Sequence, residues 1–168
     1  MPGAAPGTAA RPISFERERG VYDVRVTPGL ALIVANVDEG ENRTANMQAV
    51  FRALASHDIP IFLIKLHRSA ITFALRSDLV PKTEDCIRSI NMTCRVRNDL
   101  ALITVIASSM RDLTGVMVSI ADSLQAANAR LYGTGDSHNS VQCLIGGAHV
   151  EAAVKELRMT FGLSDARA

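Results

Sequence analysis

The sequence contains no tryptophan, and aromatic residues make up only 4% of its 168 positions. Domains that bind single-stranded nucleic acid stack bases on aromatic side chains and rely on a strong positive charge. The formal net charge here is only +1. The composition therefore disfavours DNA and RNA as partners. Of the three functional hypotheses considered below, nucleic-acid binding on a β-sheet has the least support.

Long apolar runs and paired cysteines are also missing. No stretch approaches the roughly 18 apolar residues of a membrane span, so we expect no membrane partner. The three cysteines, Cys86, Cys94 and Cys143, form an odd set without C-x-x-C spacing. This pattern predicts neither a disulfide framework nor a zinc site, and it favours a reducing, cytoplasmic location. We expect no metal or cofactor.

The chain is dominated by an internal repeat. The segment RVTPGLALIV at 25–34 recurs as RVRNDLALIT at 95–104, and the offset of seventy residues keeps apolar positions in register along the chain. This periodicity predicts two copies of one module, at 13–90 and 91–163. Residues 1–12, small and rich in Pro and Gly, are predicted to be a disordered leader, and 164–168 a short tail.

Hydrophobic periodicity predicts the same order of elements in each copy. In the first copy we expect strands at 21–26 and 30–37 around a tight turn at Thr27-Pro28-Gly29, a helix from Asn42 or Thr44 to about residue 58, strands at 60–67 and 70–76, and a helix at 82–90. In the second we expect strands at 92–97 and 100–107 around a turn at Asn98-Asp99, helices at 115–127 and 148–161, and strands at 129–135 and 139–145. The predicted fold class is α+β, with antiparallel sheets covered by helices on one face.

Three segments resemble the tandem ACT domains at the C-terminal end of aspartokinases. They are Phe51–Ala55 followed by Ile59, the segment GTGDSHNSVQCLI at 133–145, and VEAAVKELRMTF at 150–161. The Asp136-Ser137-His138 turn looks most similar to the diaminopimelate-sensitive type. The resemblance covers residues 13–163 and implies two ferredoxin-like βαββαβ modules that bind an amino acid at the seam where modules of two chains pair.

The resemblance also directs attention to the loops that open the helices. A free amino acid needs acceptors for its ammonium and donors for its carboxylate, and the N–H groups at a helix start are such donors. Carboxylates, amides and a helix start converge only at 38–45 and 110–115. Candidate ammonium or side-chain contacts are Asp38, Glu39, Asn42 and Asp112, and the amides near Thr44, Ala45, Thr114 and Gly115 are candidates for the carboxylate.

Both loops depart from the D-K-P-G usual in that family. The first copy has Asn42-Arg43-Thr44-Ala45, which is less permissive for a close backbone approach because Ala replaces Gly. The second has Asp112-Leu113-Thr114-Gly115, which keeps the glycine but lacks the proline. Which copy binds is therefore left open.

Other candidates have two interpretations each. Met110 and Met117 are core or interface filler, or they form part of a binding box. Lys65, within the apolar segment IFLIKLH, lies on a solvent-facing side of the sheet or meets an acidic partner. His138 in the turn Ser137-His138-Asn139 is a ligand-binding or pH-sensing group, or a surface residue with no role.

No catalytic arrangement is apparent. Gly146-Gly147 is not followed by the Lys and Ser or Thr of a phosphate loop, and Ser137 and its neighbours in one turn cannot orient one another as a triad. We therefore expect a non-enzymatic protein. The resemblance to aspartokinases implies a regulatory protein or subunit of lysine biosynthesis that senses lysine, threonine or diaminopimelate, forms a homodimer through its ACT modules and controls a catalytic kinase subunit. The alternative hypothesis is a structural interaction module of a kinase complex with no ligand response.

Overall fold

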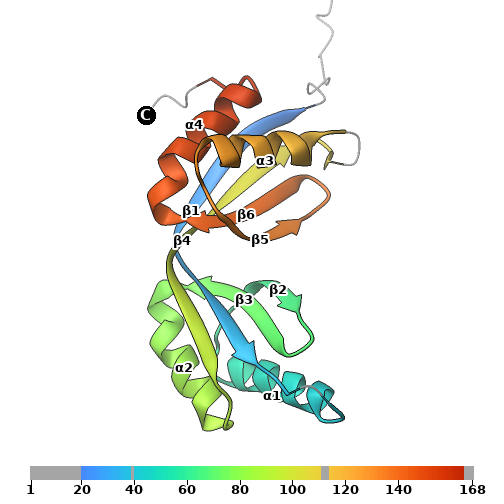
Figure 1. Cartoon of the computed structure of the whole chain (residues 1–168), viewed down its shortest axis with the longest axis vertical. Helices are drawn as coiled ribbons and strands as arrows, with labels where there is room; N and C mark the ends of the chain where they lie inside the picture. The colour runs from blue at the N-terminus through green and yellow to red at the C-terminus, as the bar shows by residue number, and fades with distance from the viewer. Residues whose placement is uncertain (1–19, 39, 111–113, 165–168) are drawn as a thin grey trace, which may run out of the picture.

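The computed structural model describes residues 20–38, 40–110 and 114–164. Within them, four α-helices pack on one antiparallel sheet of six strands in the order β2-β3-β1-β4-β6-β5 (Figure 1). The strands are β1 (Val21–Asn36), β2 (Phe62–Leu66), β3 (Ala70–Arg76), β4 (Cys94–Ala107), β5 (Leu131–Asp136) and β6 (Ser140–Gly146). The helices are α1 (Arg43–Ser56), α2 (Val80–Ser89), α3 (Val116–Ala126) and α4 (Val150–Thr160). The predicted α+β class is confirmed.

The seventy-residue offset is visible in the described elements. Strands β3 and β6 begin at Ala70 and Ser140, and the short 3₁₀ helices η1 (Ser77–Leu79) and η3 (Gly147–His149) keep the same spacing. The turn after the first helix of each half holds Asp58 and Asn128 at φ 51° and 52°. Asp and Asn adopt this left-handed conformation more readily than most other residues, so the repeat extends to the details of the backbone.

The two tight turns predicted inside the N-terminal strand pairs are wrong. Strand β1 continues through Thr27-Pro28-Gly29 and β4 through Asn98-Asp99, so each forms one long strand instead of two short ones. Each strand carries a β-bulge at this point, and the left-handed residues are Gly29 at φ 71° and Asp99 at φ 57°. A bulge tolerates these conformations as well as a turn does, so the chain bends without reversing.

The bulges also change which residues face the helices. Side chains alternate between the two faces of a strand, and an extra residue moves the alternation by one position. Val24 packs in the core under α3 and α4, whereas after the bulge Ala31 and Ile33 pack under α1 and α2. Both pairs of helices can therefore contact one strand that runs through the whole sheet.

Three hydrophobic clusters hold the sheet and helices together. Phe73 and Leu54 represent the cluster under α1 and α2, and Ile103 and Leu157 the cluster under α3 and α4. Leu30 and other residues on the opposite face of the central strands form a third cluster with Leu144 and the edge-strand residues Leu63 and Tyr132. Each fully buried large side chain contributes about 1.5–3 kcal/mol. The third cluster brings the two edges of the curled sheet together.

The cores do not follow the predicted division of the chain at residues 90 and 91. Val24 belongs to the second core, and Cys94 and Val96 pack against the first. The boundaries 13–90 and 91–163 stay a prediction, and the expected leader at 1–12 lies outside the described residues. None of the described helices is long and apolar enough to span a membrane.

Candidate ligand-binding site

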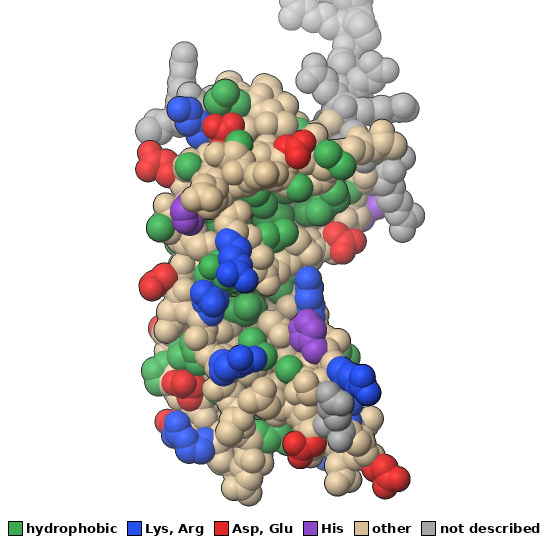
Figure 2. Space-filling model, viewed as in Figure 1, with side chains coloured by type: hydrophobic (Ala, Val, Ile, Leu, Met, Phe, Trp, Pro, Cys, Tyr) green, Lys and Arg blue, Asp and Glu red, His purple; other side chains and the backbone are tan. Residues whose placement is uncertain are grey.

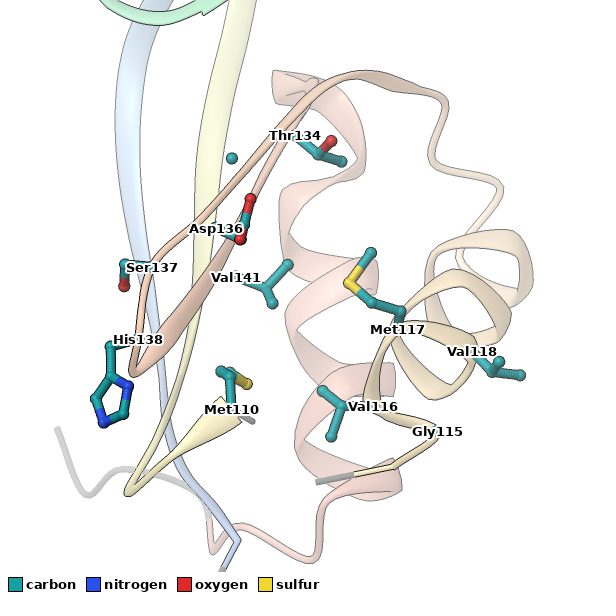
Figure 3. A pocket seen from close by; sticks show the side chains of 11 residues that line it. Met110, Gly115, Val116, Met117, Val118, Thr134, Asp136, Ser137, His138 and Val141 are labelled. Carbon is teal, nitrogen blue, oxygen red and sulfur yellow. The ribbon is translucent and has the colours of Figure 1, made fainter. Parts of the chain in front are cut away.

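A pocket of about 720 Å³ lies in the second half of the chain, between the start of α3 and the β5–β6 hairpin (Figure 3). This volume falls in the range of about 300–1,000 Å³ that is typical of small-molecule sites. The lining residues are Met110, Gly115, Val116, Met117, Val118, Thr134, Gly135, Asp136, Ser137, His138 and Val141. They come from the loop after β4, the first turn of α3 and both strands of the hairpin.

The polar groups of the pocket come from the hairpin. Thr134 and Asp136 lie two residues apart on β5, so they share one face of the strand, and Ser137 and His138 follow in the turn. The Ser137 hydroxyl lies 2.7 Å from Ser140 Oγ and donates a hydrogen bond to Asn139 Oδ1 at 3.1 Å. These contacts hold the turn in one conformation. Among the described lining residues, Asp136 is the one that offers a carboxylate to a ligand cation.

The remaining side chains of the lining are apolar. Met117 from α3 and Val141 from β6 lie on either side of the pocket, and Met110 and Val116 close one end of it (Figure 3). Hydrophobic side chains gather below α3 on the same face of the molecule (Figure 2). A few polar groups facing an apolar wall suit a small ligand with a charged head and an aliphatic part.

Gly115 determines where α3 begins. It stands at the N-cap with φ 77°, a left-handed conformation, and the helix starts at Val116. A Cβ on Gly115 would meet nothing within 4 Å, so glycine is favoured by the backbone angle and not by lack of space. The N–H groups that follow have no partner inside the helix because they belong to its first turn.

Four of the predicted site residues line the pocket, namely Met110, Gly115, Ser137 and His138. Thr114 and Asn139 flank them in the sequence, and Asp112 lies outside the described residues. Met110 lines the pocket and also packs against the core under α3 and α4, so both of its interpretations fit, whereas Met117 lines the pocket and is exposed. Whether any of these residues contacts a ligand stays a prediction.

The predicted residues of the first half do not line this pocket. Asp38 and Asn42 are exposed, Thr44 and Ala45 are exposed in the first turn of α1, and Glu39 lies outside the described residues. Lys65, in contrast, reaches the site from the far edge of the sheet. It is exposed on β2 and donates a hydrogen bond to the hydroxyl of Thr134 at 3.4 Å.

Sequence reasoning missed several lining residues, among them Thr134, Asp136 and Val141. Thr134 and Asp136 occupy every second position of β5, so the sequence shows that they share one face of the strand. Only the curl of the sheet shows that this face points toward α3. Val141 reads as an ordinary buried strand residue, and it is buried.

The cysteines take no part in the pocket. Burial raises the pKa of the Cys143 thiol to about 11, and it also raises the pKa of Cys86. The Cys86 sulfur lies 3.7 Å from His57 Nδ1, within the first half. Raised pKa values make the thiolate scarce. Among the described residues, no group of three or more His, Cys, Asp or Glu could hold a metal ion.

No family model and no curated protein matches the sequence, but solved structures match its fold. The regulatory subunit of aspartate kinase from Thermus flavus superposes with a TM-score of 0.75 at 16% identity, covering 85% of this chain and 99% of that one. The fold is that of an aspartate kinase regulatory region. A structure of aspartokinase alpha and beta subunits gives a TM-score of 0.77 at 18% identity, covering 86% of this chain and 100% of the matched one.

A longer protein with the same fold is E. coli aspartokinase III in complex with lysine and aspartate, in the T-state. It superposes with a TM-score of 0.65 at 20% identity, and the match covers 86% of this chain and 34% of that one. The described residues therefore share the α+β fold of aspartate kinase regulatory regions. At these identities the likeness concerns the fold alone.

Proposed function

We propose that this chain is a non-catalytic regulatory protein that binds an amino acid of the aspartate family and controls an aspartate kinase. The observation that carries the proposal is the pocket between α3 and the β5–β6 hairpin, which combines Asp136 with an apolar wall. The fold supports it, because structures of the same fold include aspartate kinase regulatory subunits. The match within the longer E. coli aspartokinase III is to a complex of that enzyme with lysine and aspartate.

The proposed ligand is a free amino acid, with lysine, threonine and diaminopimelate as candidates. Its ammonium would pair with the carboxylate of Asp136, which lines the pocket and is exposed on the hairpin. Its aliphatic part would contact Met117 and Val141. The N–H groups after Gly115 would receive its carboxylate.

The proposed architecture is a pair of ferredoxin-like ACT modules, one in each half. The edge strands β2 and β5 are covered only in part by each other, and exposed strand edges favour association. We propose a homodimer formed through these modules, located in the cytoplasm. We further propose a catalytic kinase subunit as partner, by analogy with the structure of alpha and beta subunits.

A thermal-shift panel with lysine, threonine, methionine and meso-diaminopimelate tests the proposal. A ligand at a hundred times its Kd stabilises the fold by about 2.7 kcal/mol, which raises the Tm of a chain of this size by about 5–10 °C. The shift should be saturable with one compound.

Two matched variants locate the binding. Asp136→Asn is expected to weaken binding of that compound about tenfold or more, since a charge-assisted hydrogen bond is lost. Asp122→Asn, on the exposed face of α3, should bind as the wild type does. If the two variants bind the compound with equal affinity, this pocket is not its binding site. No shift with any compound, together with a stable complex with a kinase subunit, would leave the structural interaction module.

A further inference from the structure

The two halves build the same frame around the pocket, and this makes their difference informative. In each half the turn is closed in the same way, by His67 N–H donating to the Ala70 carbonyl and by Ser137 N–H donating to the Ser140 carbonyl, both at 2.8 Å. In each half the end of the central strand is also tied to the turn, by a 2.9 Å bond from Val37 N–H to the Ser69 carbonyl and from Ala107 N–H to the Asn139 carbonyl.

The two halves differ in the side chain that lies between the first helix of the half and the turn of its hairpin. In the first half, Arg43 donates from Nε to the Arg68 carbonyl at 3.0 Å and from Nη2 to the His67 carbonyl at 2.7 Å. The position seventy residues later is Leu113, whose side chain has no donor. The turn residues seventy positions later are Ser137 and His138, and both line the open pocket.

The start of the helix explains why Arg43 can reach the turn. Helix α1 begins at Arg43, whereas α3 begins at Val116, which is equivalent to Asn46 at the offset of seventy. Gly115 interrupts the helical backbone in the second half, but its equivalent Ala45 adopts helical angles. The first helix is therefore one turn longer, and that extra turn carries Arg43 over the site.

We propose that Arg43 fills the first-half equivalent of the pocket, so that the part of the chain described by the structure offers one open ligand site of this kind instead of two. Its guanidinium occupies the first-half equivalent of the position beside the turn where, in the second half, the ammonium of the proposed ligand pairs with Asp136. There the His138 carbonyl accepts a hydrogen bond from Met110 N–H at 2.9 Å instead of from an arginine. The count of one site rests on the proposed function; the filling of the first half by Arg43 does not.

Chemical rescue tests the role of Arg43 without any amino acid. Arg43→Ala should lower the Tm by about 2–4 °C, and methylguanidinium chloride at low millimolar concentration should restore part of that loss in a saturable manner. The wild type should not respond, because its site is filled. Arg52→Ala removes an exposed arginine of the same helix and is the matched control.

Arg43→Ser also removes the guanidinium and vacates its space, so it carries the same test if the alanine variant folds poorly. A response of Arg43→Ala or Arg43→Ser that equals the response of Arg52→Ala would overturn the proposal.

The number of sites is measured by equilibrium dialysis of the wild type with the amino acid found in the panel. One bound equivalent per chain, lost in Asp136→Asn, is expected. Two equivalents would overturn the proposal even if methylguanidinium rescues Arg43→Ala. If no amino acid binds while rescue succeeds, the proposed function fails and the filling of the first half by Arg43 stands.

Discussion

Leu63 on β2 and Gly135 on β5 are in contact where the two edges of the curled sheet meet. A Cβ on Gly135 would lie 2.6 Å from Leu63 Cδ2 and 3.3 Å from Gln142 Oε1, so an alanine does not fit without movement. Leu63 itself has φ 51°, a backbone conformation that is unfavourable for a leucine. Because Gly135 also lines the pocket, the approach of the two edges determines the position of one pocket wall.

We expect Gly135→Ala to lower the free energy of unfolding by about 1 kcal/mol, the lower end of the usual effect of an added methyl group, because the clashing atom is the end of the Leu63 side chain and can move. Combining it with Leu63→Ala should recover part of the loss, since the second substitution removes the clashing atom. Urea denaturation of the two single variants and the double variant measures the coupling. Gly133→Ala, whose Cβ would lie 3.9 Å from Leu144 Cβ, is the control; a loss as large as that of Gly135→Ala would refute the steric explanation.

Replacing Gly115 should affect the ligand more than the fold. Gly115→Ala places a Cβ in a left-handed conformation and is expected to destabilise the chain by about 1 kcal/mol. Gly29→Ala imposes a similar strain at φ 71° in the β1 bulge, also with open space around the Cβ. Calorimetric titration should show weakened amino-acid binding only for Gly115→Ala. Equal affinities in both variants would mean that the start of α3 does not contact the ligand.

The buried Cys143 thiol gives stability a defined pH dependence. Burial raises its pKa from the ordinary value of 9.0 to about 11 in the folded chain. The folded state therefore holds the proton more tightly, so this contribution is fully present below pH 9 and is lost as the pH rises through 11. The difference of about two units corresponds to about 2.7 kcal/mol. Urea midpoints from pH 8 to 11 should fall less steeply in Cys143→Ala than in the wild type, and parallel curves would contradict the assignment.

Removing a large side chain from one core should weaken the whole sheet. Phe73 is 0% exposed, and Phe73→Ala is expected to lower the free energy of unfolding by about 3–5 kcal/mol. Met159→Ala, at a position 66% exposed, should stay within about 0.5 kcal/mol. Fluorescence of a dye bound to the second half and circular dichroism should give coincident transitions, because β1 and β4 belong to both cores. Separate transitions would show that the halves unfold independently.

Most of the fold could be predicted from the sequence, because local signals specify it. The seventy-residue offset and the apolar periodicity located the helices and the β3 and β6 strands to within a few residues. The bulges were misread because Thr27-Pro28-Gly29 suits a turn and a bulge equally. What decides between them is the pairing of Val24 with Val105, two residues 81 positions apart. No local pattern contains that contact.

The candidate site could be predicted only in part, for a related reason. Gly115 and the turn at Ser137 stand out because their chemistry is local. Asp136 and Val141 become pocket residues only after the hairpin has packed beside α3. The starts of α1 and α3 were predicted to within about one residue. What no local pattern contains is that Arg43 bonds to the carbonyls of His67 and Arg68, which lie 24 and 25 positions away.

The long strands β1 and β4 also determine what would happen if the chain were cut. A break between residues 90 and 91 would leave Val21–Thr27 on one fragment while its hydrogen-bonding partners, Leu102–Ala107, remain on the other. The pieces would not separate as independent domains. They would stay joined along two strands as the subunits of a heterodimer do, so fragments expressed separately should reassemble into the native sheet.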